Sequence, residues 1–230
     1  MFSASKGSTV NVKKVTTKSA QTSKGAIGFV VGSSSRHRHD SASSKSFCYL
    51  FRLGGSGKKS VIGHARCLKG IKHGDTVVLE FAGNSCNYDW KAVSENPEAS
   101  HLPLMSLSHF RNIYTDIVAQ LRVIGARPII LSLPELLPQR YFDFVSQGLD
   151  KSNILRWLGG DVANLSGWHE QYNRELFKLG KELGVPIVDI GSLLLNCRSL
   201  GDCYSSDGMH PNKRGLAMIA ESVVPSCLSV

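Results

Sequence analysis

The sequence predicts an α/β fold in three layers, α/β/α, with a five-stranded parallel sheet in the middle. Two patterns carry this prediction. Short, continuously apolar segments bounded by glycine or proline are typical of parallel strands that are buried on both faces. Between them lie longer segments in which apolar residues recur every three or four positions, as in an amphipathic helix. With 230 residues, of which 42% are hydrophobic and 20% charged, the chain has the size and composition of one globular domain.

Five apolar segments are predicted to form the sheet. In chain order they are residues 25–31, 60–62, 76–81, 128–133 and 185–190. The segments TVVLEF and PIILSL, the third and fourth, are the clearest. In open parallel sheets the chemistry takes place outside the carboxyl ends of the strands. Polar residues that directly follow these segments are therefore the candidates for a functional site.

The predicted helices lie between these strands and at the end of the chain. They are expected at residues 46–53, from Ser106 or Ser108 to Gly125, at 168–179 with an end at Gly184, and from Pro211 to about residue 224. Glycine commonly ends a helix and proline commonly opens one, which sets these boundaries. The connection at 135–163 is long for a loop between core elements, so we expect a helical insertion or lid there.

Positive charge is concentrated in the N-terminal third. Residues 1–74 hold 14 lysines and arginines and one acidic residue. Residues 75–230 hold 13 lysines and arginines and 17 acidic residues. Residues 1–24 are rich in Ser, Thr and Lys and are expected to form a flexible extension before a domain at 25–230. A basic arm can bind nucleic acid, but this one lacks interleaved aromatics and zinc-finger spacing, so nucleic acid is not the expected partner. An organelle-targeting role for the extension stays open.

The chain shows no sign of a membrane span or a secretory signal. No apolar run approaches the roughly 18–20 residues that a membrane helix needs, and the N-terminus lacks an apolar signal-peptide core. We therefore expect a cytoplasmic protein with reduced thiols. The six cysteines form no C-x-x-C pair and no zinc-like cluster. Only Cys197 and Cys203 are close enough in sequence to suggest a local disulfide as the alternative.

The most informative motif is DGMHPN at residues 207–212. It places Asp207 three residues before His210. A carboxylate beside an imidazole fixes the tautomer of the ring and raises its basicity, as a general base requires. The alternative is a polar loop in which Asp207 or Asn212 caps the last helix.

A nucleophile and an oxyanion donor are predicted at the same edge of the sheet. Ser34 follows the first predicted strand in a Gly-Ser-Ser-Ser turn, and Asn84 follows the third. A hydroxyl becomes a strong nucleophile when a base takes its proton, and the resulting oxyanion needs fixed donors. Ser34, His210 and Asp207 would form a catalytic triad, with the Asn84 amide and the Ser34 backbone N–H as oxyanion donors. Taken singly, the serine turn and Asn84 are equally compatible with ordinary turns.

These segments resemble the conserved blocks of the SGNH (GDSL-type) hydrolases, a flavodoxin-like family of esterases, lipases and carbohydrate deacylases. The resemblance covers residues 25–226 and is strongest at 207–212, which matches the family's terminal Asp-x-x-His block. Residues 79–85 are similar to its Gly-x-Asn-Asp block, and Gly32-Ser33-Ser34 is similar to its Gly-Asp-Ser block. The resemblance implies a serine hydrolase fold that needs no metal or organic cofactor.

The chain also departs from the family pattern. Ser33 replaces the acid before the nucleophile, Ala82 replaces a glycine, and Ser85 replaces the aspartate after Asn84. The glycine that gives the second oxyanion donor is assigned to Gly63, with Gly54 as its competitor. Ser3, in a Ser-x-Ser-Lys-Gly sequence, is a competitor for Ser34, although no apolar strand precedes it.

The sequence therefore predicts a serine esterase acting on an O-acetyl or short acyl ester of a carbohydrate or small alcohol. One alternative is a binding protein that keeps the fold and has lost turnover. A second is a nucleic-acid-associated protein that uses the basic arm. Tyr88 and Trp90, just after the Asn84 block, are expected either to line the substrate pocket or to pack against the insertion.

Overall fold

The computed structural model describes residues 71–80, 86–197 and 199–228, the last five of them as backbone only. It also places the backbone of four strand regions nearer the N-terminus. These are β1 (Ala20–Gln21), β2 (Ile27–Gly28), β3 (Val30–Gly32) and β4 (Phe47–Arg52).

The core of the molecule is a sheet with the strand order β3-β4-β5-β6-β7. Its remaining strands are β5 (Thr76–Glu80), β6 (Arg127–Leu131) and β7 (Ile187–Val188). The strands from β4 to β7 are parallel to one another, and β3 runs antiparallel to β4. β1 and β2 pair with each other as a separate two-stranded sheet. The fold is therefore α/β with a mainly parallel sheet.

Two predictions about the first half of the sheet are wrong. The strand predicted at 25–31 is divided between β2, which pairs with β1, and β3, whose Gly32 lies opposite Phe47 at the start of β4. Because β3 is antiparallel to β4, the sheet is not wholly parallel. The helix predicted at 46–53 is strand β4. Its sequence FCYLFR is rich in aromatic residues, which favour strands, and periodicity alone does not separate a short apolar run in a strand from one in a helix. The strand predicted at 60–62 lies outside the described residues.

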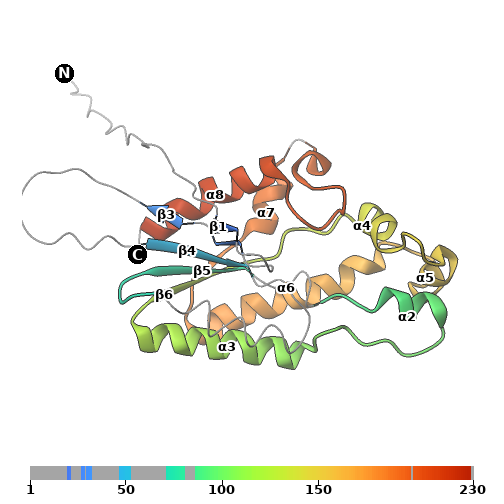
Figure 1. Cartoon of the computed structure of the whole chain (residues 1–230), viewed down its shortest axis with the longest axis horizontal. Helices are drawn as coiled ribbons and strands as arrows, with labels where there is room; N and C mark the ends of the chain where they lie inside the picture. The colour runs from blue at the N-terminus through green and yellow to red at the C-terminus, as the bar shows by residue number, and fades with distance from the viewer. Residues whose placement is uncertain are drawn as a thin grey trace, which may run out of the picture.

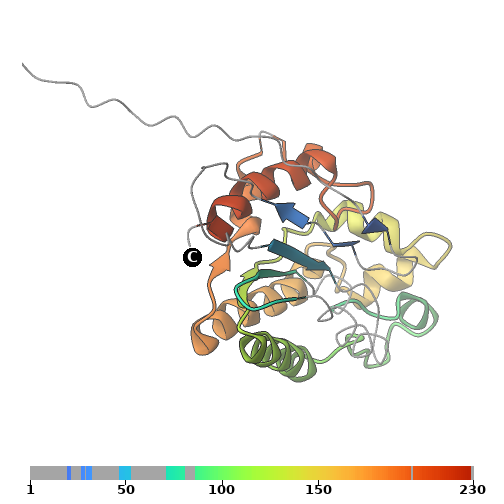
Figure 2. The same cartoon turned by 60° about the vertical axis from the view of Figure 1, so that its left-hand side comes forward.

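Alternate residues of the central strands face two separate cores. Val77, Leu79 and Ile130 pack into one hydrophobic cluster, and Val78 and Ile129 pack into another. The first cluster contains the apolar faces of α3 (Leu107–Ile124) and α6 (Asn164–Leu183), and the second contains those of α7 (Ile190–Leu195) and α8 (Lys213–Leu228). Figures 1 and 2 show α8 on one side of the sheet and α3 on the other.

The helix boundaries follow the capping signals in the sequence. Ser106 caps α3 by accepting a hydrogen bond from the backbone N–H of His109 at 3.2 Å. Gly125 and Gly184 end α3 and α6 in the left-handed conformation, with φ of 78° and 58°. The helix boundaries predicted at these three residues are thus confirmed.

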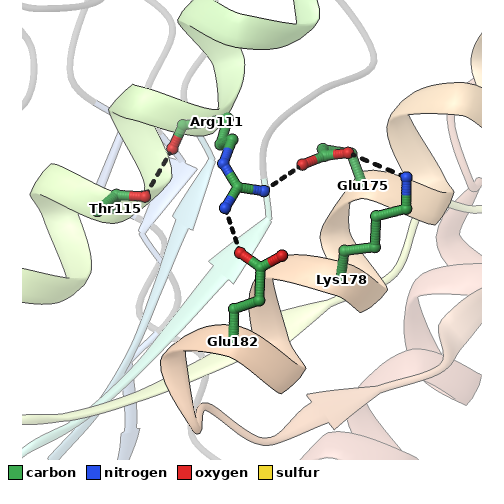
Figure 3. A network of polar contacts seen from close by, with 5 residues as sticks. All are labelled: Arg111, Thr115, Glu175, Lys178 and Glu182. Carbon is green, nitrogen blue, oxygen red and sulfur yellow. Dashed lines mark hydrogen bonds and ion pairs between the residues drawn. The ribbon is translucent and has the colours of Figure 1, made fainter.

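Helices α3 and α6 are also joined by ion pairs on their outer surface. Arg111 contacts Glu182 and lies 2.7 Å from Glu175, which in turn lies 3.7 Å from Lys178 (Figure 3). The Arg111 side chain is 40% exposed, so solvent screens these charges and their contribution to stability is modest. The hydrophobic core therefore does most to hold these two helices together, and the pairs of Arg111 add to it.

The connection at 135–163 contains two helices, α4 (Pro138–Val145) and α5 (Lys151–Trp157). Helix α2 (Trp90–Glu95), which follows β5, packs against α5. Figure 1 shows these three helices together at one end of the molecule, beyond the sheet. The loop that carries the DGMHPN motif joins η1 (Leu200–Cys203) to α8.

Candidate functional site

The loop between η1 and α8 is a tight backbone turn. Tyr204 and Pro211 form an isolated antiparallel bridge, and the N–H of Ser205 donates to the carbonyl oxygen of His210 at 2.8 Å. At the tip, Gly208 has a φ of +71°, a conformation that glycine adopts without the steric cost of a side chain. The turn brings Asp207 and His210 together.

Asp207 and His210 form the hydrogen-bonded pair that the sequence predicts. Nδ1 of His210 lies 2.6 Å from Oδ2 of Asp207. The other carboxylate oxygen accepts hydrogen bonds from the backbone N–H groups of Met209 and His210, both at 3.0 Å. These bonds fix the orientation of the carboxylate, so that one oxygen is held by the backbone and the other faces the imidazole.

The environment of Asp207 keeps it ionised. Burial raises the pKa of Asp207, but hydrogen bonds from the His210 and Met209 backbone and from the His210 ring outweigh it and leave the pKa below its ordinary value. The side chain of Asp207 is 18% exposed and that of His210 is 34% exposed. An ionised Asp207 selects the tautomer with the proton on Nδ1, which leaves Nε2 of His210 as the basic atom.

Asn212, and not Asp207, provides the cap of α8. Its Oδ1 accepts hydrogen bonds from the backbone N–H groups of Arg214 and Gly215, at 2.9 and 3.2 Å. Its side-chain amide donates to the carbonyl oxygens of Asp202 and Tyr204. The capping role considered for this motif therefore falls on Asn212, and the Asp207 carboxylate is directed to His210.

The other predicted site residues fall outside the described part of the chain. They are the nucleophile Ser34 and its competitor Ser3, and the oxyanion donors Asn84, Gly63 and Gly54. β5 ends at Glu80, four residues before Asn84, so Asn84 follows a carboxyl end that lies beside that of β6. β3 ends at Gly32 next to the amino end of β4, at the opposite edge of the sheet. The expectation that the strand before Ser34 ends at the same edge as the strand before Asn84 is therefore wrong.

The aromatic residues after the Asn84 block pack against the helical insertion. The ring of Tyr88 lies 4.9 Å from that of Trp157 in α5 and 5.5 Å from that of Trp168 in α6. Trp90 lies 6.3 Å from Tyr141 in α4. Such edge-to-face pairs stabilise beyond the area that they bury. Of the two roles considered for Tyr88 and Trp90, the structure shows packing against the insertion.

A disulfide lies next to the DGMHPN loop. Cys197, after α7, is bonded to Cys203, the last residue of η1. The expectation of reduced thiols is therefore wrong for this pair, and the alternative of a local bridge is confirmed. Cys203 also accepts a hydrogen bond from the N–H of Asn212 at 2.9 Å through its carbonyl oxygen. The thiol of Cys86 is buried, and burial raises its pKa well above the usual range, so it is unreactive.

Three further carboxylates lie near the ends of β6 and β7. Burial raises the pKa of Glu135, and the charges of Glu170 and Asp189 raise it further. Asp189 instead caps α7 by accepting from the backbone N–H of Ser192 at 3.1 Å. Among the residues that the structure describes, no group of acidic, histidine or cysteine side chains is placed to hold a metal ion.

No helix in the described part of the chain is long and apolar enough to cross a membrane.

The sequence matches no family model and no curated protein. The structure is similar to that of a GDSL-like lipase from Bacteroides thetaiotaomicron, at 14% identity and a TM-score of 0.43 over 66% of this chain and 62% of the other. It is also similar to a lipase/acylhydrolase from Enterococcus faecalis, at 12% identity and a TM-score of 0.48 over 71% and 67% of the two chains. An acetylxylan esterase from Geobacillus stearothermophilus, solved as a catalytic mutant, matches at 14% identity and a TM-score of 0.43 over 66% and 59%. The alignments thus span 59–67% of the length of these neighbours.

Proposed function

We propose that the chain is a serine hydrolase that cleaves a carboxylic ester, with Asp207 and His210 as the base half of its site. The observation that carries the proposal is the 2.6 Å contact between Nδ1 of His210 and Oδ2 of Asp207, with the second carboxylate oxygen held by two backbone N–H groups. The match of residues 207–212 to the terminal block of the SGNH hydrolases supports it. The proposed substrate is an O-acetyl or short acyl ester of a carbohydrate or small alcohol.

In the proposed reaction, Nε2 of His210 removes the proton of the serine hydroxyl as its oxygen attacks the ester carbonyl. Asp207 stabilises the imidazolium that forms, and the amide of Asn84 and the backbone N–H of Gly63 donate to the oxyanion. The imidazolium then gives its proton to the departing alkoxide, which leaves an acyl-enzyme. A water molecule, deprotonated by His210, then attacks the acyl carbon; the bond to the serine oxygen breaks, and the imidazolium returns its proton to that oxygen, which releases the acid and restores the serine.

Ser34 is the proposed nucleophile because Gly32-Ser33-Ser34 resembles the Gly-Asp-Ser block, although β3 ends at the opposite edge of the sheet from β5. Strand direction favours Ser56 as a second candidate. β4 runs parallel to β5, and the residues that follow its carboxyl end at Arg52 read Leu-Gly-Gly-Ser-Gly, with Ser56 in fourth position. The chain therefore leaves β4 at the same edge of the sheet as the segment that leads to Asn84. Ser56, like Ser34, lies outside the described residues.

A fluorophosphonate probe, followed by peptide mapping, tests the function and the nucleophile together. We expect the wild-type chain to be labelled on Ser34 and to hydrolyse p-nitrophenyl acetate, and we expect Ser34→Ala to lose both properties. Labelling of Ser56 or Ser3 would move the nucleophile and keep the hydrolase. His210→Gln should abolish labelling, whereas the exposed His109→Gln on α3 serves as a matched control. If wild type and His210→Gln react at the same background rate, the chain is not a serine hydrolase of this kind.

A further inference from the structure

Helix α4 contacts both the loop of Asp207 and His210 and the loop that follows Asn84. We propose that α4 is the positioning element of this site and that it acts through two adjacent residues, Arg140 and Tyr141. Arg140 holds the loop of Asp207 and His210, and Tyr141 holds the loop that follows Asn84. This inference rests on the proposed function, which it deepens by naming the residues that set the geometry between the two halves of the site.

Arg140 contacts the loop of Asp207 and His210, and the η1 segment before it, through two backbone carbonyl groups. Its Nη1 donates to the carbonyl oxygen of Gly201 at 3.1 Å and to that of Ser205 at 3.3 Å. Gly201 lies in η1, and Ser205 is two residues before Asp207. One guanidinium nitrogen thus bridges the two ends of the short segment that leads into the turn. A charged donor makes a stronger hydrogen bond than a neutral one, so Arg140 fixes where the turn begins.

The tip of the same loop lies directly on the first turn of α4. The N–H of Leu137 donates to the carbonyl oxygen of Gly208 at 2.8 Å. A Cβ placed on Gly208 would lie 2.7 Å from the backbone nitrogen of Tyr141 and 2.9 Å from the carbonyl oxygen of Leu137. A side chain at this position would therefore push the loop away from the helix. The close approach at Gly208 and the Arg140 bridge both fix the Asp207 turn against α4.

Tyr141 reaches the other loop. Its hydroxyl donates to Oδ1 of Asn87 at 2.8 Å, and the same oxygen accepts from Nε1 of Trp90 at 2.5 Å and from the N–H of Tyr88 at 2.9 Å. Asn87 is three residues after Asn84. Tyr141 is 2% exposed, and burial raises the pKa of its hydroxyl well above the usual range, so it stays a donor at every pH of interest.

The geometry of a helix explains why two adjacent residues can serve two loops. Successive residues of an α-helix point about 100° apart, since a turn contains 3.6 residues. Arg140 and Tyr141 therefore leave α4 in different directions, one toward residues 201–208 and the other toward residues 87–90. A displacement of about 1 Å in a catalytic geometry can lower the rate about 100-fold, so small movements of α4 are sufficient to change turnover.

Three variants of the full-length chain test the proposal, with Gln139→Ala on the exposed side of α4 as the control. We expect Arg140→Ala and Tyr141→Phe to lower kcat for p-nitrophenyl acetate about tenfold or more, with KM changed less than twofold. Arg140→Lys keeps the positive charge but loses the planar guanidinium group. Its kcat should lie between that of wild type and that of Arg140→Ala. The acidic limb of the kcat/KM profile should move to lower pH in Arg140→Ala, because a loosened Asp207 stabilises the imidazolium less well. A purely structural role would leave this limb unchanged.

Amide hydrogen exchange separates a failure of this inference from a failure of the proposed function. In Arg140→Ala we expect exchange of the amides in residues 205–210 to rise at least tenfold while α3 and α6 keep their protection. In Tyr141→Phe the rise should occur at residues 87–90. These measurements hold whether or not the chain hydrolyses esters. If both variants match Gln139→Ala in hydrogen exchange, in kcat and in the pH dependence of kcat/KM, α4 does not position the site. If Arg140→Ala does not fold, Arg140→Lys is used for the same comparison.

Discussion

Replacing Asp207 by asparagine removes one charge from the site and changes almost nothing in shape. The side-chain oxygen of asparagine can still accept from the backbone N–H groups of Met209 and His210, which hold Oδ1 at 3.0 Å each. The amide nitrogen then takes the position of Oδ2, 2.6 Å from Nδ1 of His210. Because that nitrogen is a donor, Nδ1 must become the acceptor, and the imidazole proton moves to Nε2. The ring is then a neutral tautomer that cannot take a proton at the atom facing the substrate.

The size of the effect follows from what is lost. A hydrogen bond to a charged group contributes about 1.5–3 kcal/mol, and each 1.36 kcal/mol corresponds to about tenfold in rate. Loss of the Asp207 interaction with the imidazolium thus lowers kcat about 10- to 150-fold, and the wrong tautomer lowers it further. In serine proteases, the corresponding change in a fully assembled triad costs about 10⁴-fold. Since both side chains here are partly exposed, we expect Asp207→Asn to lower kcat about 10³-fold.

The assay is steady-state hydrolysis of p-nitrophenyl acetate at pH 7.5, with fluorophosphonate labelling as a second measure. Asp202→Asn is the matched control, because Asp202 lies in the same segment and its side chain is exposed. It should stay within twofold of wild type. A kcat for Asp207→Asn above one tenth of wild type would refute the reasoning, because the 2.6 Å contact would then have no part in base catalysis.

Three further changes have effects on stability that the structure sets. Gly208→Ala adds a Cβ 2.7 Å from the backbone nitrogen of Tyr141 at a φ of +71°. We therefore expect the free energy of unfolding, measured in urea, to fall by about 2–4 kcal/mol. An unchanged urea midpoint would show that the loop shifts to accommodate the Cβ. Burial and two neighbouring carboxylates raise the pKa of Glu135, so its protonation favours the folded state at low pH and this contribution is lost as the pH rises through the folded pKa. Glu135→Gln should therefore raise the urea midpoint at pH 7 and leave it near wild type at pH 4; equal shifts at both values would contradict the assignment. Cys197→Ser, or reduction with dithiothreitol, opens the bridge to Cys203 and should lower the free energy of unfolding by about 2 kcal/mol, since the closed loop is short. The melting temperature measures this loss, and an unchanged melting temperature after reduction would contradict it.

Features that depend on neighbours in sequence could be predicted. The limits of α3 follow from Ser106 and Gly125, whose capping roles need only the local backbone. The pairing of Asp207 with His210 is equally local, because three residues and a glycine turn are sufficient to bring the two side chains together. The strands β5 and β6 were also predictable, since each is a run of apolar residues buried on both faces.

Features that depend on distant parts of the chain could not be predicted. The direction of β3 is decided by its pairing with β4, and both segments are short enough for several arrangements to fit their sequences. The role of Arg140 depends on carbonyl groups 61 and 65 residues away, and that of Tyr141 on an amide 54 residues away. No local pattern distinguishes these residues from other polar residues on an amphipathic helix. Their partners become visible only once the loops are placed in space.

The order of the strands also bears on how the protein assembles. From β3 to β7, each strand lies beside the strand that precedes it in the chain. During synthesis, each new strand can therefore add to the exposed edge of the sheet already formed, and none has to insert between two strands in place. The loop of Asp207 and His210 follows all of these strands and docks onto α4, which is made earlier. The loop of Asp207 and His210 is thus among the last parts to be completed, after the sheet that it lies beside has formed.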